Sequence, residues 1–137
     1  MAAITELDIK EEVYSDFQSN FTIHPIKKDL TRLTNEDAVK RSIRNILQTD
    51  YYERRFRPKF GANIRGYLFE NMTPITLHAI KSAVITAIEN YEPRANIIDV
   101  VVSGGDNNAV DVTLTFSVIN SLQIVSLTTS LALGKVR

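Results

Sequence analysis

The sequence predicts a small α+β domain, and the order of its apolar patterns is the main reason. Apolar residues recur at helical spacing in residues 35–49 and again in residues 74–91. Runs typical of strands follow at residues 97–102, 110–118 and 125–133. Helices followed by consecutive strands indicate the α+β class. We therefore expect a small antiparallel or mixed sheet packed against two helices.

The composition fits one globular domain and excludes several kinds of site. The chain has 137 residues, of which 44% are hydrophobic, and it contains no cysteine. Disulfides, thiolate metal sites and a cysteine nucleophile are therefore excluded. The two histidines, His24 and His78, stand too far apart in the chain for a metal-ligand motif. We expect no cofactor.

The chain shows no targeting or membrane-spanning pattern. The N-terminus lacks the basic start and apolar stretch of a secretory signal. No apolar run approaches the roughly 20 residues that cross a bilayer. We expect a soluble protein that assembles in the cytoplasm and has no membrane partner.

Residues 1–33 and 34–137 differ in pattern. The first 33 residues have no sustained period, although aromatic and branched side chains are spaced among polar ones. We interpret 1–33 as an extended N-terminal arm with one short strand around Thr22, and 34–137 as the α+β domain. An apolar arm of this kind needs a surface to lie on, either its own domain or a partner.

Local signals mark where each helix begins and ends. Thr34–Asp37 resembles a capping box at the start of the first helix, which ends near Thr49. Residues 50–69, broken by proline and glycine, are predicted to be an irregular link. Thr73 followed by Pro74 is typical of an N-cap and first helical turn, and Pro93 stops the second helix.

The strands differ in how many faces they should bury. Ile97–Val102 is branched and apolar enough to be covered on both faces. A turn is expected at Gly104–Asn108. Val110–Val118 alternates apolar and polar residues, which predicts one buried face. The last run, from Val125 onward, alternates in the same way, and the opposite phase of Leu122 and Ile124 suggests a bulge or bend near Ile124.

Carboxylates are the one source of enzyme chemistry in this sequence. Glu53, Glu70 and Glu92 lie in irregular or terminal positions, whereas a glycosidase needs two acids across a sugar, about 5–9.5 Å apart. Each also has a simpler role as a neighbour of basic residues or of a helix end. We therefore expect no enzyme. A cell-wall glycoside hydrolase of lysozyme type stays the alternative.

A basic stretch with interleaved aromatics is a candidate binding patch. It contains Arg54, Arg55, Arg57 and Lys59, among Tyr51, Tyr52, Phe56 and Phe60. Such a stretch can bind single-stranded nucleic acid. The whole chain, however, has a net charge of zero and a pI near 6.7. A patch for a protein partner, or internal salt links to Glu53 and Asp50, is the favoured interpretation, with a nucleic-acid-binding module as the alternative.

Several motifs, taken together, resemble one family. They are Arg57–Gly61, Leu68–Pro74, Asn90–Arg94 and Phe116–Ile119, in this order along residues 34–137. They resemble the gene-25-like baseplate wedge proteins of contractile phage tails, which are related to type VI secretion baseplate proteins. The resemblance implies a fold like that of the conserved domain of the tail sheath subunit.

The resemblance also implies partners and sites. The protein would be a structural component of the virion tail baseplate, docking on the wedge core bundle and providing a template for the first sheath ring by strand pairing. Tube or hub proteins are further candidate neighbours. Glu92, Pro93 and Arg94 would form the wedge-docking site. The sheath-pairing strand would consist of Val125, Ser126, Leu127, Thr128, Thr129, Ser130 and Leu131.

Overall fold

The computed structural model describes residues 14–104, 109–119 and 124–131. The chain divides into two compact units, residues 1–38 and residues 39–137. The predicted boundary after residue 33 stays a prediction.

The first unit contains a two-stranded antiparallel ribbon. Strand β1 (Ser15–Phe17) pairs with β2 (Arg32–Thr34), with Ser15 opposite Thr34. An isolated bridge joins Ile23 to Leu30 farther along the ribbon. The prediction of one short strand around Thr22 is wrong, because both strands lie away from Thr22 and the neighbouring Ile23 forms an isolated bridge rather than a strand.

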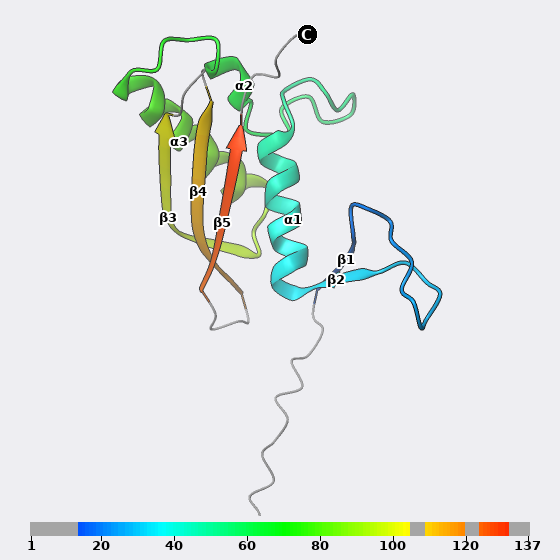
Figure 1. Cartoon of the computed structure of the whole chain (residues 1–137). Coiled ribbons are helices and arrows are strands. Elements are labelled where there is room, and N and C mark those ends of the chain that lie inside the picture. Colours follow the sequence, from blue (N-terminus) through cyan, green and yellow to red (C-terminus); the bar gives the residue numbers. More distant parts are fainter. Residues whose placement is uncertain (1–13, 105–108, 120–123, 132–137) are drawn as a thin grey trace, which may run out of the picture. The chain divides into compact units, whose positions relative to one another are not determined.

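The second unit contains a three-stranded antiparallel sheet. Strands β3 (Ala95–Gly104), β4 (Val110–Val118) and β5 (Ile124–Leu131) follow in the order β3-β4-β5 (Figure 1). Both β3 and β5 are therefore edge strands of this sheet. The α+β class and the antiparallel sheet are confirmed.

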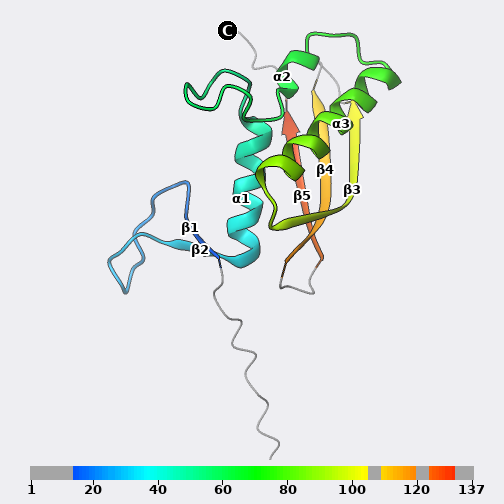
Figure 2. The same ribbon diagram turned by 180° about the vertical axis from the view of Figure 1, so that it is seen from behind.

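The helices are α1 (Asn35–Gln48), α2 (Ile64–Tyr67) and α3 (Pro74–Tyr91). Helix α3 lies across one face of the sheet, and α1 stands beside β5 in both views (Figures 1 and 2). The predicted cap of α3 is confirmed, because the Thr73 side chain accepts a hydrogen bond from the N–H of Thr76 at 3.3 Å. The prediction that residues 50–69 are irregular throughout is wrong, because α2 lies within them.

The core lies between the helices and one face of the sheet. Its largest fully buried apolar side chains include Phe116, Leu114, Ile43, Ile80 and Ile88. Strand β4 buries every second residue, and β5 does the same for Val125, Leu127 and Thr129, as their alternation predicts.

Strand β3 differs from its prediction. Ile98 and Val101 are 52% and 53% exposed, so the expectation that Ile97–Val102 is covered on both faces is wrong. A register shift between Ile97 and Asp99 interrupts the alternation, and no described helix or strand covers the outer face. The turn predicted at Gly104–Asn108 falls mostly outside the described residues. From Ile124 onward the β5 register is regular.

Candidate docking site

The Glu-Pro-Arg turn is a buried ion pair at the junction of α3 and β3. Glu92 caps the C-terminus of α3, where its N–H donates to the Ile88 carbonyl at 2.8 Å. Its side chain is only 2% exposed. Arg94 donates from Nε to Glu92 Oε1 and from Nη2 to Oε2, the latter at 2.7 Å. The guanidinium thus binds the carboxylate with two parallel hydrogen bonds.

The electrostatics of Glu92 favour its charged form. Burial of the carboxylate works to raise its pKa. The hydrogen bonds from Arg94 and from Ser42, together with the positive charge of Arg94, outweigh burial and leave the pKa of Glu92 below its ordinary value. Because Ser42 lies on α1, this one carboxylate links α1, the end of α3 and the start of β3. The sequence interpretation of the triplet as a wedge-docking site did not include this contact with α1.

The outer side of the turn remains accessible. Pro93 is exposed, and the Arg94 side chain is 35% exposed while it holds Glu92. A partner could therefore contact Pro93 and the outer edge of the guanidinium but not the Glu92 carboxylate.

The backbone at the start of the sheet fixes which way the N–H groups of β4 point. Ile119 donates its N–H to the Arg94 carbonyl at 2.9 Å, flanking the pair Ala95–Val118. In an antiparallel ladder this pattern marks Ala95–Val118 as a pair without mutual hydrogen bonds. Odd-numbered residues of β4 therefore direct their N–H groups toward β3, and even-numbered ones direct theirs toward β5.

The same alternation assigns the outward groups of β5. Even-numbered residues of β4 stand opposite Val125, Leu127, Thr129 and Leu131. These four residues consequently direct their N–H and C=O groups toward β4. The backbone groups of Ser126, Thr128 and Ser130 point toward the open edge, and all three residues are exposed.

The opposite edge, formed by β3, is blunted. By the same alternation Val100 points its N–H outward, and the carboxylate of Asp99 accepts that hydrogen bond at 2.8 Å. Asp99 also approaches Lys81 of α3 at 3.8 Å. A bulge and a charged side chain are two of the usual ways in which proteins protect an edge strand.

The basic stretch forms a well-connected loop, residues 50–61, between α1 and α2, which we call the basic loop. Arg54 stacks over the Phe60 ring at 4.2 Å, and Phe60 contacts Tyr91 of α3 with ring centroids 4.8 Å apart. The structure thus places the basic loop beside the C-terminal end of α3. Arg54, Arg55, Arg57 and Lys59 are all exposed.

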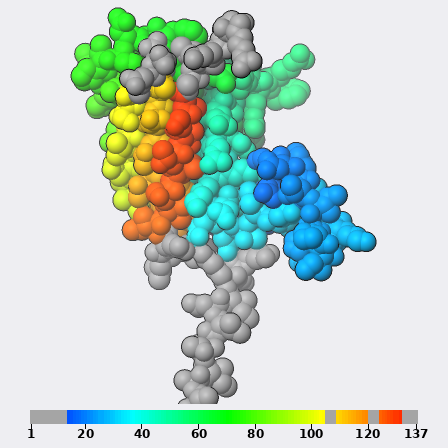
Figure 3. Space-filling view, in the orientation of Figure 1, coloured from blue at the N-terminus to red at the C-terminus, as the bar shows by residue number. Residues whose placement is uncertain are grey.

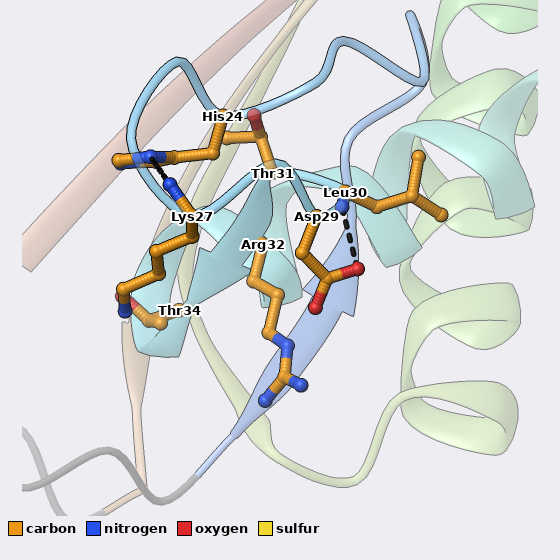
Figure 4. A pocket seen from close by; sticks show the side chains of 7 residues that line it. All are labelled: His24, Lys27, Asp29, Leu30, Thr31, Arg32 and Thr34. Atoms are coloured by element: carbon orange, nitrogen blue, oxygen red, sulfur yellow. Dashed lines mark hydrogen bonds between the residues drawn. The ribbon is translucent and has the colours of Figure 1, made fainter.

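The other polar candidates have local structural roles. Glu53 is exposed and accepts the N–H of Asp50 at 3.1 Å, and Glu70 is exposed as well. In the first unit, a hollow of about 280 Å³ is lined by side chains around His24 (Figure 4). His24 accepts the N–H groups of Ile26 and Lys27 at 3.3 and 3.2 Å, so it closes a turn.

Neither a metal-binding cluster nor a membrane-spanning helix is found in the part of the chain that the structure describes. Within residues 14–104, 109–119 and 124–131, no group of three or more acidic or histidine side chains could hold a metal ion. Over the same part of the chain, no helix has both the length and the apolar character that crossing a membrane requires.

Comparison with known proteins decides the family. The sequence model of a family described as "Baseplate wedge protein gp25" matches residues 34–124. A relative from Enterobacteria phage T4, baseplate wedge protein gp25, is 33% identical over 111 residues, covering 80% of this chain and 83% of the relative. The chain belongs to the gp25 family of baseplate wedge proteins. The family resemblance stated from the sequence is thereby confirmed, and the protein is a structural component of a contractile-tail baseplate.

Solved structures share the gp25 fold. The crystal structure of a suspected tail lysozyme from Geobacter sulfurreducens has a TM-score of 0.67 and 27% identity, covering 77% of this chain and 97% of that one. A chain of the anti-feeding prophage baseplate has a TM-score of 0.61 and 20% identity, covering 85% and 83%. A chain of the postcontracted pyocin R2 baseplate has a TM-score of 0.52 and 18% identity, covering 82% and 98%. The last two similarities show the shared fold alone.

Proposed function

We propose that this gp25-family protein docks on the wedge core bundle and serves as a template for the first sheath ring by strand pairing at β5. The main supporting observation is the contrast between the sheet edges. Strand β5, Ile124–Leu131, contains no charged residue, no proline and no register shift, and Ser126, Thr128 and Ser130, whose backbone groups point outward, are exposed residues.

The physical mechanism is β-augmentation. Ser126, Thr128 and Ser130 direct N–H and C=O groups outward, and a strand of the sheath protein would satisfy them with main-chain hydrogen bonds. Since α1 stands beside β5, the incoming strand would also lie against this helix (Figure 1). Several such pairings around one ring would gain strength through multivalency, because each bound strand raises the effective concentration of the next.

Docking on the core bundle would use the outer side of the Glu-Pro-Arg turn. Glu92 positions Arg94 through two hydrogen bonds, so the guanidinium is held in place before a partner arrives. Pro93 restricts the backbone between them. In this arrangement Pro93 and Arg94 would contact the core bundle, while Glu92 acts through Arg94.

The protein works without catalysis in this proposal. A general acid of a glycosidase needs a raised pKa in a cleft, whereas the pKa of Glu92 is lowered and its carboxylate is paired with Arg94. Glu53 and Glu70 are exposed and lie on the surface. None of these three glutamates therefore fits the general acid of the glycoside hydrolase alternative, and a nucleic-acid partner is not expected.

Proline substitutions at neighbouring positions of β5 test the strand-pairing proposal. Thr128→Pro removes an N–H that points to the open edge, so the isolated protein should keep most of its stability. Baseplates containing this variant should nevertheless fail to start sheath assembly, measured by counting sheathed tails in electron micrographs. Thr129→Pro is the matched control, since it removes an N–H directed at β4 and should destabilise the domain by about 1–3 kcal/mol or more.

Two outcomes would contradict the proposal. Normal sheath assembly on baseplates that contain folded Thr128→Pro protein would show that the sheath docks elsewhere. Equal destabilisation by Thr128→Pro and Thr129→Pro would show that the outward direction of the Thr128 N–H is wrongly assigned.

A further inference from the structure

The basic loop is held in one conformation by its own contacts. The Tyr52 N–H donates to the Pro58 carbonyl at 2.7 Å and joins the two arms of the loop. Gly61 closes it with a φ of 112°, and a Cβ at this position would lie 2.1 Å from the Thr49 carbonyl oxygen. Tyr91 of α3 donates its hydroxyl to the Lys59 carbonyl at 2.8 Å. The loop is therefore anchored at its base and along one side.

This ordered loop holds large aromatic side chains in water. Phe56 is 99% exposed and Tyr52 is 80% exposed. The loop projects from the second unit in the space-filling view, beside α2 (Figure 3). Exposure of a phenylalanine forgoes the free energy that its burial would contribute. A rigid loop that presents this side chain is already arranged for binding, because little conformational freedom remains to be lost.

The charges around Phe56 are positive and available. No ion pair of Arg55, Arg57 or Lys59 is found among the described residues, and all three are exposed. The two acids of the loop are engaged, since Glu53 accepts the Asp50 N–H and Asp50 pairs with Arg65 at 3.5 Å. Aromatic and arginine side chains are also the residue types that dominate binding energy at protein interfaces.

We propose that the basic loop is a docking site for a second baseplate protein whose surface has an apolar pocket ringed by aspartate or glutamate. Phe56 would fill the pocket, and Arg55, Arg57 and Lys59 would face the acidic rim. Charge complementarity selects this partner. A nucleic acid could also stack on exposed aromatics, but a chain of zero net charge lacks the overall attraction that a dedicated nucleic-acid binder uses.

This contact is separate from the two contacts of the proposed function. The basic loop uses neither the β5 edge nor the Glu-Pro-Arg turn. Its loss should reduce incorporation of the protein into the baseplate, whereas Thr128→Pro should leave incorporation intact and stop sheath assembly. Failure of one proposal can therefore be distinguished from failure of the other.

The first experiment measures how much of each variant is incorporated into baseplates of the contractile-tail system whose genome encodes this chain. Phe56→Ala should lower the amount incorporated about tenfold or more, as expected of a central aromatic anchor. Its thermal stability should not change, because the side chain makes almost no internal contact. Phe69→Ala is the matched control, since Phe69 is 78% exposed and lies outside the loop. An equal loss for both variants, or no loss for Phe56→Ala, would overturn the proposal.

The second experiment identifies what touches position 56. The photoreactive replacement Phe56→p-benzoylphenylalanine is assembled into purified baseplates and irradiated, and the crosslinked peptide is sequenced. A peptide of another baseplate protein with aspartate or glutamate near the crosslink is the expected result. Incorporation of the double variant Arg55→Glu and Arg57→Glu should fall as well, because reversed charges repel an acidic rim. A nuclease-sensitive adduct, or no adduct with any baseplate protein, would contradict the proposal.

Discussion

The two edges of the three-stranded sheet present opposite solutions to the same problem. An edge strand exposes backbone donors and acceptors that can pair with any other strand. Strand β3 has a register shift between Ile97 and Asp99, and the carboxylate of Asp99 occupies the outward N–H of Val100. Strand β5 keeps a regular register over Ile124–Leu131 and presents serine and threonine outward.

In the proposed function, this difference would confine strand pairing to the β5 edge. A protein that avoided all strand pairing would need protection on both edges. Here the bulge and the charge are on β3, and β5 is polar enough to stay in water while its backbone remains able to pair. One protected and one open edge allow a strand to be added on one side of the sheet, which a template for a ring of subunits requires.

Breaking the Glu92–Arg94 ion pair at the start of β3 should have the largest effect on stability, and it should affect β3 more than β5. Removal of one partner of a buried ion pair costs about 3–5 kcal/mol. Arg94→Ala should cost about 3 kcal/mol, the lower end of that range, because Arg94 is partly exposed and Ser42 still donates to Glu92. Urea unfolding measures the loss, and hydrogen exchange should show faster exchange in β3 than in β5.

Arg94→Lys is the control for charge alone. It keeps the positive charge but loses the two parallel hydrogen bonds, so its stability should lie between those of the wild type and Arg94→Ala. Full stability of Arg94→Ala would show that the turn is not structural. Docking would then be the main role of Arg94, as the sequence first suggested.

Acid should weaken the same junction to a smaller extent. The pKa of Glu92 lies below its ordinary value in the folded protein, so its contribution to stability is present above the unfolded-state pKa. That contribution is lost as the pH falls through the folded-state pKa. Glu92→Gln should be less stable than wild type at neutral pH, and the gap should narrow in acid. Urea unfolding at a series of pH values checks this; parallel curves for the two proteins would contradict it.

The sequence predicted the regular elements better than the long-range contacts of Glu92. The Thr73-Pro74 start of α3 and the alternation in β4 are local patterns, and the structure confirms both. Helix α2 was missed because four residues are too short for a helical period. The burial of Glu92 was missed because its partner Ser42 lies on another helix, and no local pattern reports a contact between residues fifty positions apart.

The character of the two sheet edges could be predicted only in part, because it also depends on contacts between residues far apart in the sequence. Alternation in β5 indicates which side chains face the core, but the direction of its N–H groups depends on the register with β4. The Ile119–Arg94 hydrogen bond shows which N–H groups of β4 face β3, and the β4–β5 register then assigns the direction of those of β5. Likewise, Asp99 is an ordinary surface acid in the sequence, and its protective role follows from its place beside the bulge.

The smallest expected effect on stability tests whether Asp99 protects the β3 edge. Asp99→Ala removes the carboxylate that accepts the Val100 N–H and approaches Lys81. Both interactions are partly or largely exposed to water, so the substitution should lower the free energy of unfolding by no more than about 1 kcal/mol. The uncovered edge should instead associate with other copies, detected by analytical ultracentrifugation over a range of concentrations.

Asp99→Asn retains a side-chain oxygen that can accept the same hydrogen bond without the charge. If the cap is what protects the edge, Asp99→Asn should associate less than Asp99→Ala. Equal association of both variants would assign the protection to the charge, and association no greater than that of wild type in either variant would leave the bulge as the sole protection of β3.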